Sequence, residues 1–284
     1  MNQKFSHHEE YLKRKRRRRL VNTGLLFFTI ALVLGISSYV AHMDRFRITK
    51  INLFGGILVV EDEIQKKSFE YLDSSYFWLY PKNNALIYPK KELEDFLRNN
   101  FKRIDTIDIS LSGFKRMEVL ITERKHFAIW CLGQPQKDSP SENCYFMDRN
   151  STVFAPAPSF SGDAYFKYYG PIDSDNPIGH EYISSSTIFS DISGFVDFAK
   201  KMSLKPLYVV SKSDGEYEMK LANGGNILFN SKESLQKTSD NLSALLSTEA
   251  LSKLDRGDLP VEYLDLRFGN KLYYKLKATS TVAE

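Results

Sequence analysis

The sequence predicts an α+β protein that follows a single N-terminal transmembrane helix. Two observations lead to this prediction. The first is a long apolar segment without charges near the N-terminus, and the second is a mixture of strand and helix patterns after it, in which strands outnumber helices. The residues after the apolar segment, 41–284, suit two small domains better than one.

The apolar segment runs from Leu20 to Val40 and contains no charged residue. At ~1.5 Å per residue, a helix over this segment is about 31 Å long, which matches a hydrocarbon core of ~30 Å. Seven consecutive cations, Lys13–Arg19, precede it, whereas its other flank is nearly neutral. Because Lys and Arg stay on the cytoplasmic side, we expect a cytoplasmic tail at 1–19, a span at 20–40, and an extracytoplasmic remainder. This is the topology of a single-pass type II protein of the cell membrane.

Two other interpretations of the segment fit less well. A cleaved signal peptide has a shorter apolar region of roughly 7–15 residues and a small-residue cleavage site, which Ser37–Ala41 does not provide. A buried core helix rarely reaches this length without a charge, and seven adjacent cations do not flank one.

The basic character of the chain belongs to its tail. The net charge is +4, but residues 1–19 alone carry +6, so the remainder is slightly acidic at −2. The tail is therefore expected to face anionic lipid at the inner leaflet, and the outer part gives no reason to expect nucleic acid. We expect no metal at His7–Glu10, because four adjacent residues in a solvated tail make a poor site.

The first outer domain reads as strand, helix, helix, strand, strand. A strand is expected at Phe46–Phe54, ended by Gly55–Gly56, and an aromatic connector at Tyr76–Tyr80. A helix follows the acids Glu61–Glu63, a second helix follows Pro89 over Lys90–Asn100, and strands follow at Ile107–Leu111 and Met117–Glu123. A three-stranded sheet with two helices on one face is the compact arrangement of these elements.

The rest of the chain, 125–277, reads as a β-rich domain with a mixed or antiparallel sheet and two helices, followed by a frayed tail at 278–284. Helices are expected at Ser190–Ser203 and from a cap at Ser231 to about Ser247. Strands are expected at Phe127–Leu132, Cys144–Asp148, Thr152–Phe154, Leu207–Ser211, Tyr217–Leu221, Asn226–Asn230, Val261–Phe268 and Lys271–Leu276. Residues 155–186 give no clear pattern.

The two cysteines, Cys131 and Cys144, both lie in the outer part. An extracytoplasmic compartment permits a disulfide, and thirteen positions apart the two residues are able to close a hairpin with a long loop. Two thiols without a bridge are an equally good interpretation of the sequence.

Several of these segments together resemble the FtsQ/DivIB family of bacterial cell-division proteins. The opening strand Phe46-x-Ile48-x-x-Ile51-x-Leu53-x-Gly55 is similar to that of the family's POTRA domain. The segment Glu123–Trp130 looks like the exit from POTRA into the family's β domain, and 263–275 looks like its closing hairpin. Asp148–Phe154 resembles an early D-x-x-G-x-x-F turn, except that Ser151 stands in place of the glycine.

This resemblance implies a POTRA domain at 46–124 and a non-enzymatic scaffold at the division septum, without catalytic residues, metal or cofactor. The implied partners are small bitopic coiled-coil division proteins, FtsB/DivIC-like and FtsL-like, and other membrane proteins of the divisome. The implied docking surface is the closing hairpin, which comprises Phe268, Gly269, Asn270, Lys271, Leu272, Tyr273, Tyr274, Lys275 and Leu276. POTRA is the implied membrane-proximal recruitment module.

Two alternatives belong to other functional classes. A serine acyl-enzyme needs a Ser-x-x-Lys motif, which Ser234–Lys237 and Ser112–Lys115 both match without the accompanying Ser-Asp-Asn or Lys-Thr-Gly motifs. A POTRA-bearing receptor for translocated polypeptides usually carries several POTRA modules and a membrane barrel, whereas this chain has one module and a helical anchor. The outer histidines show no zinc-ligand spacing.

The closing hairpin also suggests a docking mode on physical grounds. Alternation along Val261–Phe268 places Leu264, Leu266 and Phe268 on one face, which we expect to be buried, and the residues between them on the other. Little chain follows the last strand, so we expect it to lie at a sheet edge, where a partner peptide is able to add a strand. An acidic partner residue is expected to meet Arg267 or Lys275.

Overall fold

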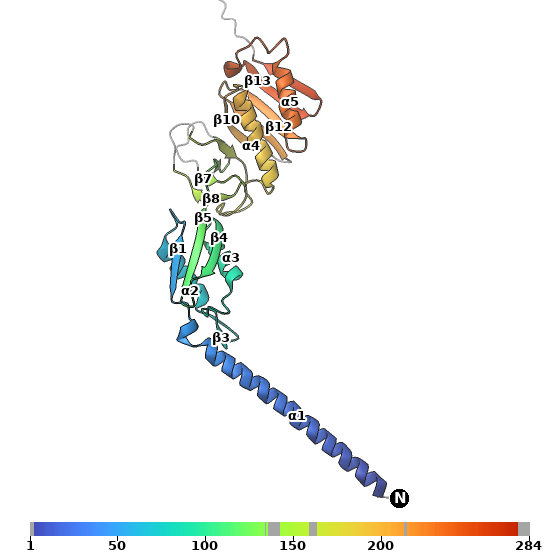
Figure 1. Cartoon of the computed structure of the whole chain (residues 1–284). Helices are drawn as coiled ribbons and strands as arrows, with labels where there is room; N and C mark the ends of the chain where they lie inside the picture. Colours follow the sequence, from blue (N-terminus) through green and yellow to red (C-terminus); the bar gives the residue numbers. More distant parts are fainter. Residues whose placement is uncertain (1–2, 134, 136–142, 159–163, 213–214, 278–284) are drawn as a thin grey trace, which may run out of the picture. The chain divides into compact units, whose positions relative to one another are not determined.

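The computed structural model describes residues 3–133, 135, 143–158, 164–212 and 215–277 (Figure 1). The chain forms two compact units, Met1–Glu123 and Arg124–Glu284. The fold is mixed α and β, with five α-helices and one large mixed sheet in the described part.

The N-terminal helix α1 runs from Gln3 to Ala41, and its segment Arg14–Ala41 is long and apolar enough to cross a membrane. The side chains of the apolar segment are exposed in the isolated chain, for example Phe27 (71%) and Val33 (64%). The helix also extends through the basic run and back to Gln3, within the tail that was expected to be solvated. A single helix satisfies all its own backbone hydrogen bonds, as a segment in lipid must.

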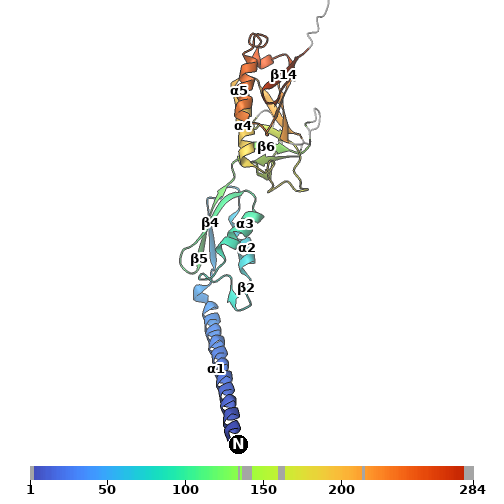
Figure 2. The same ribbon diagram turned by 90° about the vertical axis from the view of Figure 1, so that its right-hand side faces the viewer.

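The rest of the first unit is a three-stranded sheet with two helices on one face (Figure 2). Its main elements are β1 (Lys50–Phe54), α2 (Glu61–Leu72), α3 (Lys90–Asn100), β4 (Ile104–Leu111) and β5 (Arg116–Glu123). The strand order is β1-β5-β4, with β1 parallel to β5 and β4 antiparallel to it. Ile64 and Leu72 of α2 and Leu93 and Leu97 of α3 are buried against the sheet. The predicted strand–helix–helix–strand–strand order is therefore present.

Two local features of this unit differ from the expectation. The first strand begins only at Lys50, because Asp44–Phe46 forms a short 3₁₀ turn. The aromatic connector is a small hairpin of β2 (Ser75–Tyr76) and β3 (Tyr80–Pro81). Gly55 ends β1 with φ of +82°, and a Cβ there would collide with the carbonyl oxygen of Ile121. The glycine of the opening-strand pattern is thus required by close packing.

Glu123, the last residue of β5, binds the loop that follows β1. Its carboxylate accepts hydrogen bonds from the backbone N–H groups of Ile57 (2.7 Å), Leu58 (2.7 Å) and Val59 (2.9 Å). Burial raises the pKa of Glu123, but these three hydrogen bonds and the charge of Arg103 outweigh it, so the pKa lies below its ordinary value of 4.5. The ionised form is therefore favoured by folding.

We expect Glu123→Ala to lower the free energy of unfolding of the first unit by about 1–3 kcal/mol near neutral pH, because three N–H groups lose a charged acceptor. Since the folded pKa is depressed, this stabilisation is present above the ordinary pKa and is lost as the pH falls through the folded pKa. Denaturant titrations near neutral pH and in acid measure the difference. Glu70→Ala is the control, because Glu70 is exposed and its ion pair with Lys67 lies on the surface of the same helix. An equal loss at both pH values would contradict the assignment.

The second unit is built on a nine-stranded sheet and two helices. Its strands are β6 (Ala128–Cys131), β7 (Cys144–Met147), β8 (Val153–Pro156), β9 (Lys167–Tyr169), β10 (Pro206–Ser211), β11 (Glu216–Leu221), β12 (Asn226–Asn230), β13 (Val261–Phe268) and β14 (Lys271–Leu276). The helices are α4 (Ser186–Lys201) and α5 (Leu235–Leu246). The strand order is β14-β13-β12-β11-β10-β9-β6-β7-β8.

Both helices cover the same face of this sheet, as Figure 2 shows. Helix α4 connects β9 to its parallel neighbour β10, and α5 connects β12 to its parallel neighbour β13. Strands β9 and β12 run in the same direction, and both crossovers lead to the neighbouring strand on the same side in the sheet. Because such connections are right-handed, both helices lie on the same face. They bury a core that includes Phe189 and Phe195 of α4 and Leu242 of α5.

The opposite face of the sheet is covered only in part by side chains of the described residues. A smaller cluster lies over β6–β10 and includes Ile129, Phe146, Phe154 and Tyr169. His126 stacks on it, with its ring centroid 4.0 Å from that of Phe146. Toward β14 this face instead carries polar and aromatic side chains, which form the candidate site.

The helix start after β12 differs from the prediction. Ser231 was expected to cap α5, but the helix begins at Leu235 with Ser234 at the N-cap position. Asn230 explains the delay, because its Oδ1 accepts hydrogen bonds from the N–H groups of Lys232 and Glu233 and holds these residues in a turn. Asn side chains commonly compete with the helix backbone in this way.

Candidate functional site

The hairpin singled out by the sequence analysis lies at one end of the nine-stranded sheet. Strand β13 ends at Phe268, Gly269 turns the chain with φ of +63°, and β14 returns antiparallel along β13. Strand β14 is the outermost strand of the sheet among the described residues. Its second backbone edge is therefore available for pairing with another strand.

Exposed aromatic side chains flank this edge. Tyr273 is 49% exposed, Tyr274 40% and Phe268 55%. Tyr274 pairs with Leu264 and thus lies on the helix-covered face, whereas Tyr273 pairs with Asp265 on the open face. Large aromatic rings with one polar end are frequent in protein interfaces. A strand added beside β14 would contact aromatic rings on both of its faces.

Phe268 does not lie where alternation predicted. Leu264 and Leu266 are buried as expected, but Phe268 is exposed and packs edge-to-face on Tyr273, with ring centroids 5.6 Å apart. The pairing register between β13 and β14 shifts between Asp265 and Phe268. Such an irregularity ends the two-residue period, so the last side chain of β13 leaves the core face.

The charges beside the edge are already paired within the chain. Arg267 donates to both carboxylate oxygens of Asp265 (2.9 and 2.7 Å) and to Glu216 (2.8 Å). The hydrogen bond to Asp265 raises the pKa of Arg267 further, so the guanidinium stays charged. Lys275 pairs with Glu262 at 2.7 Å. The two cations expected to meet an acidic partner residue thus have acidic neighbours of their own.

A shallow hollow of about 500 Å³ lies on the open face beside β14. Its lining residues are Leu228, Tyr263, Asp265, Arg267, Phe268 and Tyr273. Leu228 and Tyr263 were not identified from the sequence as site residues. Leu228 carried a signal, because it is apolar on the side of β12 where its neighbours Asn226 and Asn230 are polar.

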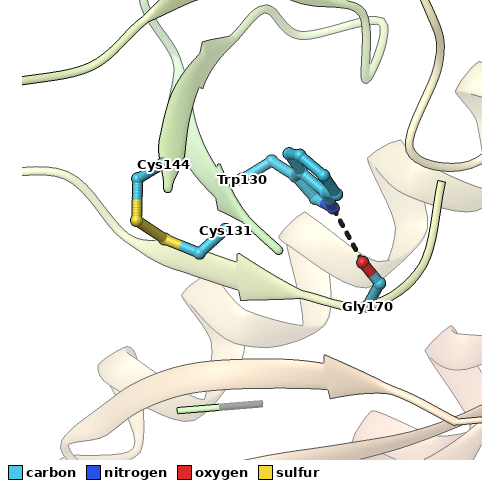
Figure 3. Close-up of a disulfide and its surroundings, with 4 residues drawn as sticks. All are labelled: Trp130, Cys131, Cys144 and Gly170. Carbon is cyan, nitrogen blue, oxygen red and sulfur yellow. Dashed lines mark hydrogen bonds between the residues drawn. A yellow bond between two sulfur atoms is a disulfide. The ribbon is translucent and has the colours of Figure 1, made fainter. Parts of the chain in front are cut away.

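A disulfide joins Cys131 and Cys144, which pair directly across β6 and β7 with a Cα–Cα distance of 4.2 Å. Figure 3 shows the bridge on one side of β6 and Trp130 on the other. Trp130 is buried in the helix-covered core and donates its indole N–H to the carbonyl oxygen of Gly170 (3.2 Å). Of the two interpretations of the cysteines, the structure contains the bridge.

Reduction of this disulfide is expected to lower the free energy of unfolding of the second unit by about 3 kcal/mol, the chain-entropy value for a loop of this size. Equilibrium unfolding of the full chain with and without a reductant measures the change, followed by the emission of Trp130 in a Trp78→Phe background. Cys131→Ser/Cys144→Ser should reproduce the reduced value and no longer respond to the reductant. Equal thiol titration of the denatured chain before and after reduction would contradict the bridge.

The structure gives the positions of some of the residues that were considered for catalysis and metal binding. Ser234 precedes α5 as its N-cap, and the Lys237 ammonium lies 3.7 Å from Glu233. Within the described residues, no group of three or more His, Cys, Asp or Glu side chains is arranged to hold a metal ion. The side chains of His7 and His8 lie outside the described part.

The turn at Asp148–Phe154 has a structural role. Asp148 Oδ1 accepts the N–H groups of Asn150 (2.8 Å) and Thr152 (2.9 Å), and Oδ2 pairs with Arg124 at 2.5 Å. Ser151, in the glycine position of the pattern, has φ of +64°. Its hydroxyl donates to the carbonyl oxygen of Ile183 (2.7 Å), which offsets the strain of a left-handed serine.

In comparisons with known proteins, no protein-family model matches the chain, and no curated protein matches it significantly.

Proposed function

We propose that the chain is a non-enzymatic scaffold of the FtsQ/DivIB type, anchored in the cell membrane by α1 and active at the division septum. In this proposal the first unit is a POTRA domain that serves membrane-proximal recruitment. The β14 edge of the second unit captures a small bitopic division protein of the FtsB/DivIC or FtsL kind. The basic tail is cytoplasmic, whereas the part of the first unit after α1 and the whole second unit are extracytoplasmic.

The observation that carries the proposal is the outer edge of β14, which pairs with no strand of the described residues and is flanked by exposed rings. An exposed edge is a liability in a soluble protein, and proteins usually shield it with charge, proline or a covering element. Here Lys271 and Lys275 give modest protection, whereas Phe268, Tyr273 and Tyr274 offer contact area. Because the edge is open and flanked by aromatic side chains, it is better suited to the addition of a partner strand than to exposure to solvent.

Three further features support an extracytoplasmic anchored scaffold. Segment Arg14–Ala41 of α1 is suited to crossing a membrane, and the seven cations before Leu20 favour a cytoplasmic N-terminus. The Cys131–Cys144 bridge fits an oxidising compartment. After α1, the first unit has the strand–helix–helix–strand–strand order of main elements that was predicted from its sequence.

In the proposed docking mode, a partner segment would pair with β14 through main-chain hydrogen bonds and so extend the sheet by one strand. Side chains on one face of that segment would contact Tyr273, Phe268 and the hollow that Leu228 lines. Side chains on the other face would contact Tyr274. The Arg267–Asp265–Glu216 network would fix the shape of this surface, because the guanidinium of Arg267 is held between the carboxylates of Asp265 and Glu216.

Imaging of dividing cells tests the proposal directly. A fluorescent protein fused before Met1, on the cytoplasmic side of the proposed topology, is expected to form a midcell band that follows constriction. The same fusion to residues 1–43 alone is the control, because it keeps the anchor and lacks both outer units; we expect it to spread evenly around the membrane. An even distribution of the full-length fusion throughout the cell cycle would overturn the assignment to the septum.

A further inference from the structure

The small hairpin β2–β3 of the first unit exposes two large aromatic residues at its tip. Phe77 is 83% exposed and Trp78 87%. The N–H of Leu79 donates to the carbonyl oxygen of Tyr76 (3.0 Å), so Phe77 and Trp78 are the two central residues of a tight turn. Both rings are thus directed away from the buried core of the unit, of which neither is a member.

The backbone of this turn is strained. Phe77 has φ of +48° and Trp78 has φ of +51°, a conformation that favours glycine and asparagine in two-residue turns. A bulky residue in this region is a genuine outlier, and two in succession are kept only where the surroundings impose them or a function uses them. The tip therefore presents aromatic rings at a position where the fold itself favours small residues.

Hydrogen bonds fix this hairpin to the end of α1. The amide of Asn84 donates to the carbonyl oxygen of Ala41 (2.8 Å), at the last residue of the helix. Ser38 donates to the carbonyl oxygen of Leu79 (2.7 Å), and the hydroxyls of Ser37 and Tyr80 lie 2.7 Å apart. Asn84 contacts α1 at its last residue, whereas Leu79 contacts it at Ser38. The second contact lies about one helical turn, roughly 5 Å, closer to the N-terminus.

The hairpin tip is therefore directed along α1 toward its apolar segment. In Figures 1 and 2 the hairpin lies at the end of the first unit where α1 enters it. Ser37 and Ser38 belong to the last turns of the charge-free segment that ends at Val40. If α1 spans a membrane, the tip lies at the level where acyl chains meet lipid headgroups.

We propose that Phe77 and Trp78 insert into the outer leaflet of the membrane at the boundary between headgroups and acyl chains, as a second anchor beside α1. This inference rests on the part of the proposed function that places α1 across the membrane, and it is independent of any division partner. Trp and Tyr gather at this depth because one end of the ring is apolar and the other donates a hydrogen bond. Tyr39 of α1, 74% exposed at the level of Ser38, belongs to the same aromatic belt.

The second anchor fixes the first unit against the bilayer. A single helix alone leaves an outer domain free to rotate about the point of attachment. A hairpin that is hydrogen-bonded to the helix and inserted in the leaflet adds a second contact, so the unit has one preferred orientation to the membrane plane. The hairpin is part of the fold, because Lys82 at its base lies over the rings of Tyr71 (4.9 Å) and Tyr76 (5.5 Å).

Fluorescence quenching by brominated lipids tests the insertion on the full chain in lipid vesicles. The chain has two tryptophans, Trp78 and the buried Trp130, so Trp78→Phe isolates the emission of Trp130. We expect lipids brominated near the headgroup end of the acyl chain to quench the native chain strongly. Quenching should be weaker with bromine near the methyl end, and Trp78→Phe should lose the quenchable emission in both lipids.

A second variant tests whether α1 spans the membrane, independently of whether Trp78 inserts into it. Phe28→Trp/Trp78→Phe places an indole in the middle of the apolar segment of α1, where bromine near the methyl end of the chains should quench it most. If that indole is quenched while native Trp78 is not and stays accessible to acrylamide, the second anchor is wrong and the span stands. If neither is quenched, α1 does not span the bilayer and both proposals are overturned.

Discussion

The double variant Tyr273→Ala/Tyr274→Ala is expected to weaken capture of the proposed division partner by roughly 30-fold or more, because loss of an interface hot spot costs about 2 kcal/mol or more. The two rings lie on opposite faces of β14, next to Asp265 and Leu264 respectively. An added strand would contact both, so removing them strips side-chain contact from each side of the proposed interface. Main-chain pairing alone would remain.

Binding of the purified full chain in detergent to the proposed bitopic division partner measures this effect. Phe114→Ala is a matched control, because Phe114 is 46% exposed and forms a similar edge-to-face pair with Phe46 (5.2 Å) in the first unit. Leu272→Pro and deletion of residues 271–284 should abolish capture. Since Leu272 packs on the core, these two variants count only if circular dichroism shows an intact fold. Unchanged capture by folded edge variants would move the site elsewhere, with the POTRA-like unit the next candidate.

Asp148→Ala is expected to lower the free energy of unfolding of the second unit by about 3–5 kcal/mol, the usual cost of breaking a buried ion pair from one side. The side chain of Asp148 is only 9% exposed, and that of its partner Arg124 is 15% exposed. The change removes the carboxylate from Arg124 and from the N–H groups of Asn150 and Thr152. The turn after β7 would lose its central acceptor.

Chemical denaturation of the full chain, followed by the emission of Trp130 in a Trp78→Phe background, measures this loss. Asp197→Ala is the control, because Asp197 pairs with Lys200 on an exposed helix face, and such a pair contributes at most about 0.5 kcal/mol. Asp148→Asn should fall between the two, since it keeps an acceptor for the turn and loses the charge. A loss no larger than that of Asp197→Ala would show that the Arg124 pair is not a determinant of stability.

Elements with a strong local signal were predicted well from the sequence. Helix α3 runs from Lys90 to Asn100 as predicted, because Pro89 marks its start and Leu93 and Leu97 repeat at helical spacing. The hairpins at Gly224 and Gly269 follow turn chemistry in the same way. In these elements a few neighbouring residues determine the structure.

Elements that depend on distant neighbours were missed. Strand β9 has three residues and exists because β6 and β10 pair with it on both sides. The β2–β3 hairpin carries aromatic residues at positive φ, against every local turn preference. The order of the nine strands, and hence the open face, follows from crossovers that no local pattern encodes.

The candidate site also combines features that were predicted from the sequence with features that were missed. The edge position of β14 was expected from the sequence, and β14 is the outermost strand of the sheet among the described residues. The exposure of Phe268 depended on a register shift, and the hollow depended on Leu228 of β12 lying next to β13. The binding of Arg267 by Glu216 joins residues from two strands that are not neighbours in the sheet.

Site-specific photo-crosslinking in living cells tests the claim that β14 is the docking edge most directly. A photoreactive phenylalanine analogue is introduced at Lys271, Tyr273 or Lys275, and at Phe114 of the first unit as the control position. We expect the β14 positions to crosslink to one small bitopic membrane protein during division and Phe114 not to do so. Crosslinks from Phe114 to that protein, with none from any β14 position, would contradict the account.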